Sequence, residues 1–234
     1  MPSMFTRQAP IVAIDGPAGA GKSTVSKLLA ARLYYRYLDT GAIYRSVTLL
    51  AQRLGIDWGD EEGLCQLVDD LPINFVWIEG ENRVFLAGVD ETEAIRQEHI
   101  GLGSSQVSSH PGVREGLLGL QRRLGQLGGV VVDGRDIGTV VFPDAELKFF
   151  LVADPHERAL RRFRELEAKG TPAALEEVEA TLAARDKQDS ERPVAPLKQA
   201  EDAERVDTTG MSVEQVLALL VSRVEAWRVQ DVGE

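Results

Sequence analysis

The glycine-rich segment at residues 16–23 constrains the fold of this chain more than any other feature of its sequence. It reads Gly-Pro-Ala-Gly-Ala-Gly-Lys-Ser and matches the pattern G-x-x-x-x-G-K-[ST]. An apolar run, IVAI at residues 11–14, precedes it, and an amphipathic helical pattern follows from Lys22. Glycines allow backbone N–H groups to turn inward around a phosphate, and the N-terminus of the helix adds its dipole. The segment therefore predicts a strand, a loop and a helix that together bind a nucleoside triphosphate.

Two side chains at the end of this segment have predicted roles of their own. We expect Lys22 to bridge the β- and γ-phosphates as a compact positive charge. We expect the Ser23 hydroxyl to help hold Mg²⁺, through the substrate phosphates and water. The plainer alternative is a glycine-rich turn without a ligand, but the flanking strand and helix favour the nucleotide site. Switch GTPases, motor ATPases and small-molecule kinases share such a site, so other residues must distinguish them.

The rest of the chain alternates between strand and helix patterns. Parallel strands that are covered on both faces are apolar throughout, and such runs are typical of an α/β protein. The predicted strands are 11–14, 34–38, 130–133, 147–152 and 205–208. The predicted helices begin at Lys22 and then span about 42–54, 60–70, 93–108, 112–127, 155–168, 173–187 and 213–228. Ser212 and Gln215 form a capping box for the last helix. We predict a three-layer α/β/α fold with five parallel strands.

Residues 72–92 interrupt this alternation. The pattern there is strand 73–78, polar turn 79–82 and strand 83–86, with a third short strand near Val89. Consecutive strands joined by a short polar turn form an antiparallel hairpin. We therefore predict a small β insertion, and its flanks lead toward Ser105. A protein-docking surface is the alternative role for it; we favour a flap beside the second substrate.

Composition restricts the partners and the compartment. The chain has 26 basic and 37 acidic residues, for a net charge of −11, which argues against a nucleic-acid polymer as partner. The longest apolar runs are far shorter than the ~18 residues that span a bilayer, so no membrane association is expected. A single cysteine, Cys65, allows no intrachain disulfide and fits a reducing, cytoplasmic compartment. Residues 1–9 are expected to be a flexible leader.

Arginine is unusually frequent at strand ends and helix starts. Of the 26 basic residues 20 are Arg, and Arg45, Arg114, Arg135 and Arg192 fall at or near such places. The carboxyl ends of parallel strands face the ligand crevice in open α/β sheets. Phosphoryl transfer requires positioning and positive charge around the migrating group more than covalent chemistry. The pattern indicates that a phosphorylated acceptor meets the nucleotide, although each arginine alone could be an ordinary solvated charge.

Five segments together resemble those of the bacterial cytidylate (CMP/dCMP) kinases, in the nucleoside-monophosphate kinase group. They are IDGPAGAGKST (14–24), LDTGAIYR (38–45), SSQVSSHPGVRE (104–115), DGRDIGTVVFPDA (133–145) and RDKQDSERPVAPL (185–197). The resemblance runs in the family's order over residues 10–228, and the β insertion resembles the extension that marks the bacterial form. It implies transfer of the γ-phosphoryl group of ATP to CMP or dCMP, with Mg²⁺ accompanying ATP.

The resemblance also implies residue roles. For ATP these are Gly16, Pro17, Ala18, Gly19, Ala20, Gly21, Lys22, Ser23 and Thr24, with Arg161 and Arg162 on a lid that closes over the nucleotide. For CMP they are Thr40, Tyr44, Arg45, Ser105, Arg114, Arg135, Asp136, Arg185, Asp189 and Arg192. The catalytic residues it implies are Lys22, Arg135, Arg158 and Arg192. Ser105, Arg114 and Asp136 would read the cytosine edge, and a carboxylate facing an amino group would distinguish cytosine from uracil.

The implied organisation is one kinase fold over 10–228. Its core would comprise 10–58, 109–154 and 188–228, its nucleoside-monophosphate-binding region with the insertion 59–108, and its short helical lid 155–187. The enzyme would act as a monomer. Three glycines of the predicted helix 112–127, Gly116, Gly119 and Gly125, have no functional explanation in the sequence.

Two alternatives to this function remain open at the level of sequence. One is a kinase for UMP or another small phosphorylated acceptor, against which segment 133–145 argues. The other is a GTPase-type switch, which would normally carry an N/T-K-x-D motif. The nearest match, Asp186-Lys187-Gln188-Asp189, has Asp where Asn or Thr should stand and follows a helix instead of a buried strand.

Overall fold

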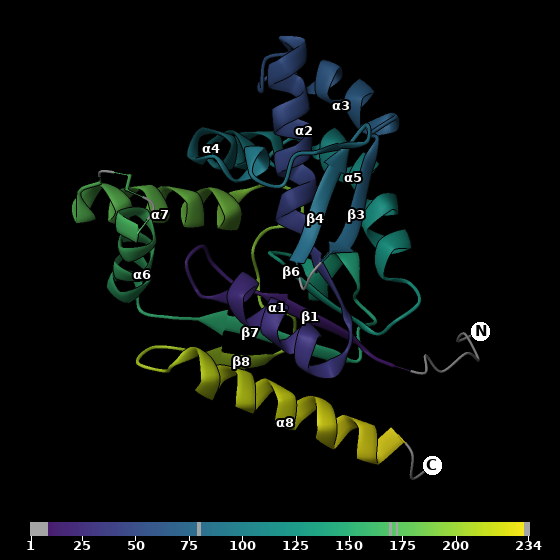
Figure 1. Ribbon diagram of the computed structural model, residues 1–234, viewed down its shortest axis with the longest axis vertical. Helices are drawn as coiled ribbons and strands as arrows, with labels where there is room; N and C mark the ends of the chain where they lie inside the picture. The colour runs from purple at the N-terminus through teal and green to yellow at the C-terminus, as the bar shows by residue number, and fades with distance from the viewer. Residues whose placement is uncertain (1–8, 79–80, 169, 172, 232–234) are drawn as a thin grey trace. The chain divides into compact units, whose positions relative to one another are not determined.

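The computed structural model describes residues 9–231 with the exception of 79–80, 169 and 172 (Figure 1). The predicted leader, 1–9, therefore lies almost wholly outside the described residues. The chain divides into two compact units. The first unit comprises the chain up to Leu38, Leu127–Glu191 and the chain from Ala195 onward; the second comprises Asp39–Gln126 and Arg192–Val194. Residues 39–58 and 109–126, assigned to the core by sequence, thus fall in the second unit, and the predicted functional regions stay a proposal.

A five-stranded parallel sheet forms the centre of the first unit, as predicted. Its strands are β1 (Ile11–Asp15), β2 (Arg36–Asp39), β6 (Val130–Gly134), β7 (Leu147–Val152) and β8 (Glu204–Asp207). The spatial order is β2-β6-β1-β7-β8, so β1 lies in the middle. The register places Ile14 beside Asp133 and Asp15 beside Gly134. The glycine-rich loop and the segment after β6 therefore leave the sheet from adjacent strands at the same edge.

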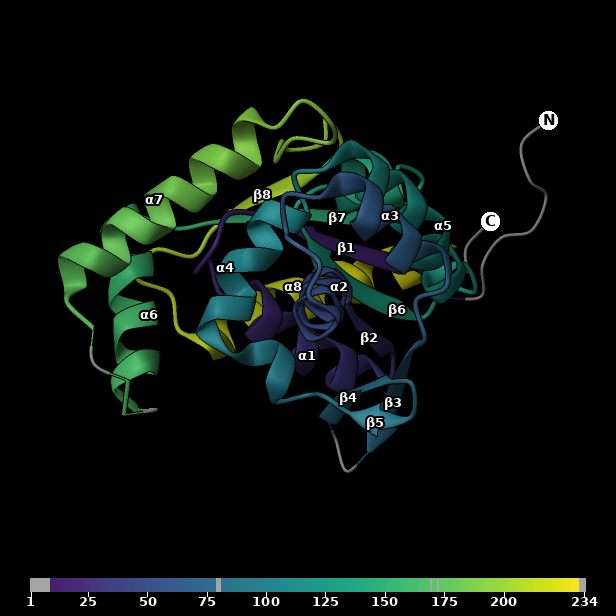
Figure 2. The same ribbon diagram turned by 90° about the horizontal axis from the view of Figure 1, so that it is seen from above.

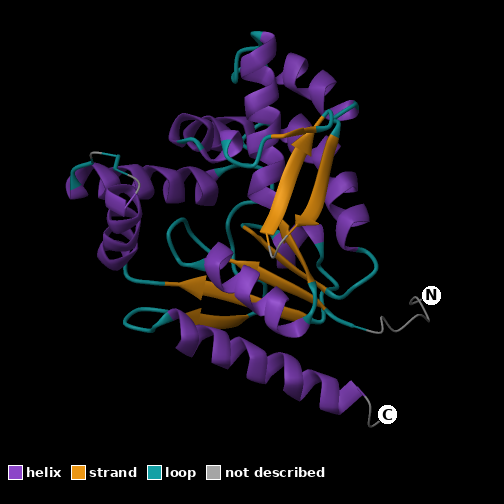
Figure 3. Ribbon diagram, in the orientation of Figure 1, coloured by secondary structure: helices purple, strands orange, loops and turns teal. Residues whose placement is uncertain are grey.

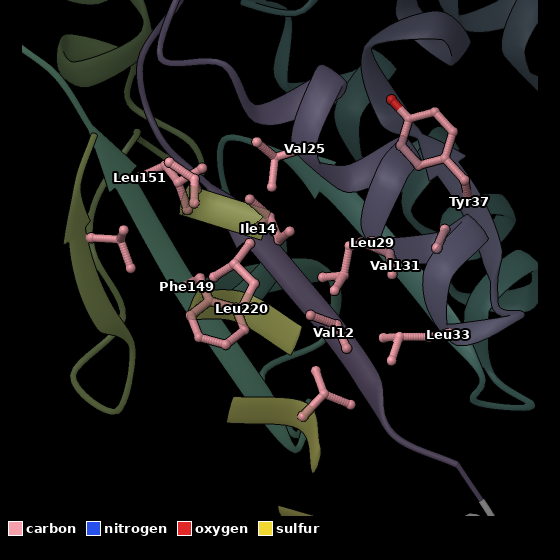
Figure 4. Close-up of a cluster of buried hydrophobic side chains, with 14 of the residues drawn as sticks. Val12, Ile14, Val25, Leu29, Leu33, Tyr37, Val131, Phe149, Leu151 and Leu220 are labelled. Atoms are coloured by element: carbon pink, nitrogen blue, oxygen red, sulfur yellow. The ribbon is translucent and has the colours of Figure 1, made fainter. Parts of the chain in front are cut away.

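Two helices of the first unit, α1 (Lys22–Leu33) and α8 (Val213–Asp231), pack against each other and against this sheet. Figure 4 shows the apolar side chains between them, including Val12, Leu29, Phe149 and Leu220. Complete burial of an aliphatic or Phe side chain contributes roughly 1.5–3 kcal/mol, which explains why every residue of β1 is buried. The capping box of α8 is confirmed: Gln215 N–H donates to Ser212 Oγ, and Ser212 N–H donates to Gln215 Oε1 at 2.8 Å.

The predicted strand 34–38 begins too early. Tyr34 lies in the left-handed region with φ of 57° and caps the C-terminus of α1, and its N–H donates to Ala31 O. The strand starts only at Arg36. The aromatic residues of this stretch raise its strand propensity, but the helix has to end before the chain can enter the sheet.

A helical hairpin of the first unit follows β7. It consists of α6 (Pro155–Ala168) and α7 (Leu175–Glu191), which lie side by side in Figure 2. Ala159, Leu166, Val178 and Leu182 form a small apolar cluster between them, and Ala18 of the glycine-rich loop belongs to the same cluster. The predicted helix 173–187 is therefore displaced: it begins two residues later and continues to Glu191.

The second unit contains helices and the antiparallel insertion. Its helices are α2 (Thr40–Leu54), α3 (Glu61–Asp69), α4 (Glu98–Val107) and α5 (Pro111–Gly125). The strands β3 (Ile73–Ile78), β4 (Glu81–Leu86) and β5 (Val89–Asp90) pair antiparallel, as predicted (Figure 3). The predicted helix 93–108 is wrong in its first part, because a 3₁₀ turn, η1 (Ala94–Arg96), ends before α4 begins.

Close helix packing explains one of the unexplained glycines. A Cβ atom at Gly116 of α5 would lie 2.6 Å from Val68 Cγ1 of α3, so a larger residue has no room there. A Cβ atom at Gly119 would lie 3.4 Å from its nearest neighbour, an Arg123 nitrogen at the end of a flexible side chain. Among the described residues, no helix is both long enough and apolar enough to cross a membrane.

Candidate active site

The glycine-rich loop has the backbone that its sequence predicts. Gly16 and Gly21 have φ of 148° and 85°, conformations that residues with a side chain rarely adopt. A Cβ atom at Gly16 would lie 2.0 Å from the Leu151 carbonyl oxygen of β7. The loop therefore depends on glycine both for its turn and for its close approach to the sheet.

Lys22 lies at the first position of α1 and is buried. Its Nζ donates to the Pro17 carbonyl oxygen at 2.6 Å, which folds the side chain back over the loop. Burial lowers the pKa of Lys22, and the positive charge of Arg135 lowers it further, while Asp133, Asp189 and Asp15 oppose the change. The lysine is thus a cation that a neighbouring anion would strongly stabilise.

The carboxylate of Asp133 links the loop to the sheet. Ser23 Oγ donates to Asp133 Oδ2 at 2.7 Å, and the Tyr37 hydroxyl donates to Asp133 Oδ1 at 2.9 Å. Asp133 and Tyr37 are buried, whereas Ser23 is exposed. The sequence analysis assigned no role to Asp133, although its place as the acidic end of an apolar strand beside β1 could have indicated one.

A second buried carboxylate, Asp15, fixes the segment after β6. Its Oδ1 and Oδ2 accept from the backbone N–H groups of Ile137 and Gly138, both at 2.8 Å. These residues open a π-helical turn, η2 (Ile137–Val141), that the sequence did not predict. Burial raises the pKa of Asp15 to about 6, although the two backbone hydrogen bonds counteract part of the effect. Asp15 therefore holds the backbone directly after Asp136, which is itself buried.

Arg135 forms an ion pair with α7. Its Nε donates to Asp189 Oδ2 at 2.7 Å, and its Nη1 donates to the Gly134 carbonyl oxygen. Negative neighbours, Asp189 foremost, outweigh burial and raise the pKa of Arg135. The structure thus brings two residues of the predicted CMP set together. Arg185 lies one turn before Asp189 on the same helix.

The hairpin contacts the glycine-rich loop through Arg158 and Asp186. Arg158 is buried and donates to the Ala18 carbonyl oxygen at 2.8 Å and to Asp186 Oδ2 at 2.5 Å. Asp186 Oδ1 accepts from the Ala18 N–H at 3.1 Å. Sequence reasoning did not assign Asp186, because only the fold places α7 against the loop.

The other two predicted lid arginines lie in different surroundings. Arg161 donates to Thr208 Oγ1 at 3.1 Å and to the Thr208 carbonyl oxygen at 2.7 Å. A Cβ atom at Gly21 would lie 3.9 Å from an Arg161 nitrogen, so this side chain is near the loop. Arg162 instead pairs with Glu165 of its own helix.

In the second unit, the predicted residues form two local groups. Asp39 caps α2 by accepting from the Ala42 N–H, and Arg45 pairs with Asp39 at 2.5 Å. The Arg114 guanidinium lies over the Tyr44 ring, 5.4 Å from its centroid, and donates to the Ser108 carbonyl oxygen. The remaining predicted residues of this unit are Thr40 at the start of α2, Ser105 on α4 and Arg192. Thr40, Tyr44, Arg114 and Arg192 are buried.

The chain is similar to known proteins over most of its length. Residues 12–226 match the model of the family described as cytidylate kinase. The cytidylate kinase of Citrifermentans bemidjiense is 53% identical over 216 residues, which cover 92% of each chain. That of Syntrophotalea carbinolica is 53% identical over 214 residues, covering 92% of this chain and 91% of its own. The Enterococcus faecalis cytidylate kinase is 51% identical over 209 residues, covering 89% and 92%.

Proposed function

The chain belongs to the cytidylate kinase family, and on that premise we propose that it transfers the γ-phosphoryl group of ATP to CMP or dCMP. The products are CDP or dCDP, so the enzyme is a phosphotransferase with a phosphate group as acceptor. The observation that supports this most is the register of β1 and β6, which sets the glycine-rich loop beside the Asp133–Asp136 segment. Membership of this family also removes the GTPase-type switch as an alternative.

We assign ATP binding to the glycine-rich loop and to the residues that contact it. Backbone N–H groups of Gly16 to Thr24 and the N-terminus of α1 supply positive potential for the phosphates. The buried Lys22 ammonium supplies a full charge beside them, and the phosphates would in turn keep it protonated. Arg158 and Arg161 add charge from the hairpin. We keep Arg162 in the lid as a proposal, supported by its place on α6.

The residues present fit Mg²⁺ held mainly by substrate. Ser23 is exposed and donates its proton to Asp133, so its oxygen lone pairs stay available to a cation. Among the described residues no group of three or more His, Cys, Asp or Glu is placed to hold a metal. Mg²⁺ commonly uses one or two protein oxygens together with phosphate oxygens and water. When bound, it would neutralise charge on the ATP phosphates.

For the acceptor, we propose contacts from both units. In the first unit, Asp136 would accept a hydrogen bond from the cytosine amino group, Arg185 and Asp189 would contact the ribose, and Arg135 would face the transferring phosphoryl group. In the second unit, we propose the set Thr40, Tyr44, Arg45, Ser105, Arg114 and Arg192. The Arg135–Asp189 pair supports this assignment, because it preorganises one guanidinium and the carboxylate for the ribose together.

Catalysis in this scheme is positioning and charge stabilisation by the chain's own residues. Lys22, Arg135, Arg158 and Arg192 would surround the migrating phosphoryl group with positive charge as its bond to the leaving oxygen lengthens. Closure of the hairpin over ATP would exclude water, so that the acceptor phosphate oxygen is the nucleophile. We further propose that the enzyme works in the cytoplasm, the compartment that its single cysteine favours, and as a monomer.

The specificity assignment is testable at Asp136. We expect Asp136→Ala to lower kcat/KM for CMP by about a hundredfold while changing that for UMP little, because a buried acceptor for the amino group is lost. Steady-state rates with CMP and UMP at fixed ATP would measure this. Asp144→Ala is the matched control, since Asp144 is exposed on the same segment. An unchanged ratio of CMP to UMP use in Asp136→Ala would assign base reading to other residues and would reopen the UMP-kinase alternative.

A further inference from the structure

Tyr37 combines an apolar position with a polar contact. Its ring belongs to the core between α1 and the sheet and is 5% exposed. Figure 4 shows the ring at the periphery of that cluster, with the hydroxyl oxygen at its outer end. That hydroxyl donates to Asp133 Oδ1 at 2.9 Å. A Phe at this position would fill the same space, so packing alone does not require the hydroxyl.

Asp133 connects Tyr37 to the nucleotide site. Its Oδ1 accepts from Tyr37 and its Oδ2 accepts from Ser23, so the two oxygens of one buried carboxylate are held by hydroxyls from β2 and α1. The terminal torsion of an Asp side chain is broad and has weak intrinsic preferences. A donor on each oxygen fixes this torsion and hence the direction in which Asp133 faces Ser23.

The direction of the Ser23 proton decides what the Ser23 oxygen can do. A hydroxyl has one proton and two lone pairs, and it can act as a cation ligand only when the proton points elsewhere. Asp133 accepts that proton at 2.7 Å and leaves the lone pairs of the exposed hydroxyl free. If the carboxylate turns, the proton loses this fixed acceptor.

We propose that Tyr37 is a positioning residue of the ATP site: its hydroxyl orients Asp133 so that the Ser23 oxygen can take part in binding ATP as its Mg²⁺ complex. The inference rests on the proposed function for the use of Mg·ATP, and it does not depend on the acceptor nucleotide. Residues that orient metal ligands from behind commonly change metal affinity by about 10- to 100-fold when they are lost. Tyr37 should therefore affect the gain in ATP affinity that Mg²⁺ provides.

The test is calorimetric titration of the full chain with ATP, in excess Mg²⁺ and separately in EDTA. We expect Tyr37→Phe to reduce the Mg²⁺-dependent gain in affinity about tenfold and to leave the affinity in EDTA unchanged. Tyr35→Phe is the matched control: it removes a hydroxyl that accepts from Arg228 on the surface of the same unit, and it should titrate like the wild type.

A second background tests the route through Ser23. If Tyr37 acts through Asp133 and Ser23, adding Tyr37→Phe to Ser23→Ala should cause little further loss of the Mg²⁺-dependent gain. An undiminished gain in Tyr37→Phe would overturn the proposal. So would an equal loss with and without Mg²⁺, or loss of folding, because the hydroxyl would then be structural. Failure of the wild type to phosphorylate CMP would contradict the proposed function and leave these binding results intact.

Discussion

At the scale of residues, the site is a set of buried charges that the fold holds in pairs. Removing a charge from water is costly unless it has a partner, and most of these groups have one: Arg158 has Asp186, and Arg135 has Asp189. Asp15 has no cation in hydrogen-bond contact and relies on two backbone N–H groups. Burial raises its pKa to about 6 for this reason.

The raised pKa of Asp15 gives a pH prediction with a definite sign. The folded protein binds the Asp15 proton more tightly than the unfolded chain, whose pKa is near 3.8, so stability is lost as pH rises toward 6 and is constant above it. The free energy of unfolding of the wild type, relative to Asp15→Asn, should fall by about 2 kcal/mol between pH 4.5 and 7.5. Urea denaturation of both proteins across this range measures it. A difference that is flat or rises with pH would show that burial does not govern this carboxyl.

At the scale of elements, local pattern predicted most of the fold. The apolar strands β1, β6 and β7 and the capping box of α8 depend on contiguous residues, and the sequence was sufficient for them. Tyr34 and the 3₁₀ turn before α4 were mispredicted, because helix ends depend on caps and packing more than on periodicity. The π-helical turn η2 was missed because Asp15, far away in sequence, holds it.

The same division applies to the site. The glycine-rich loop and the arginines at strand ends are visible as motifs, so they could be proposed from sequence. Asp133, Asp186 and Tyr37 have no motif of their own: their significance comes from strand register and from the packing of α7 against the loop. Gly116 likewise became intelligible only once Val68 was found beside it.

The contact between α3 and α5 gives a prediction at this scale. Gly116→Ala should destabilise the protein by about 1–2 kcal/mol, since overpacking against the stiff Val68 side chain outweighs the better helix propensity of Ala. Gly119→Ala on the same helix should instead stabilise by up to about 1 kcal/mol, because its surroundings can accommodate a methyl group. Thermal and urea denaturation of the two variants would measure both effects. Equal stabilisation by both would contradict close packing at Gly116.

At the scale of the whole molecule, the net charge of −11 conceals a sorted distribution of arginine. Arg135, Arg158 and Arg161 gather around the glycine-rich loop and the neighbouring strand ends of the first unit. Others, such as Arg223 with Glu204 and Arg53 with Glu91, form ion pairs far from the loop in sequence. An acidic protein can thus present positive charge where two phosphorylated substrates are proposed to meet.

The central claim concerns the reaction as a whole, namely phosphoryl transfer from ATP to a cytosine monophosphate. It is tested most directly by initial rates of the wild-type enzyme with CMP, dCMP, UMP and AMP at equal concentrations, in excess ATP and Mg²⁺. We predict that CMP and dCMP are used with kcat/KM at least about a hundredfold above that for UMP and AMP, because a buried carboxylate selects the cytosine amino group. Equal or preferential use of UMP would contradict this account.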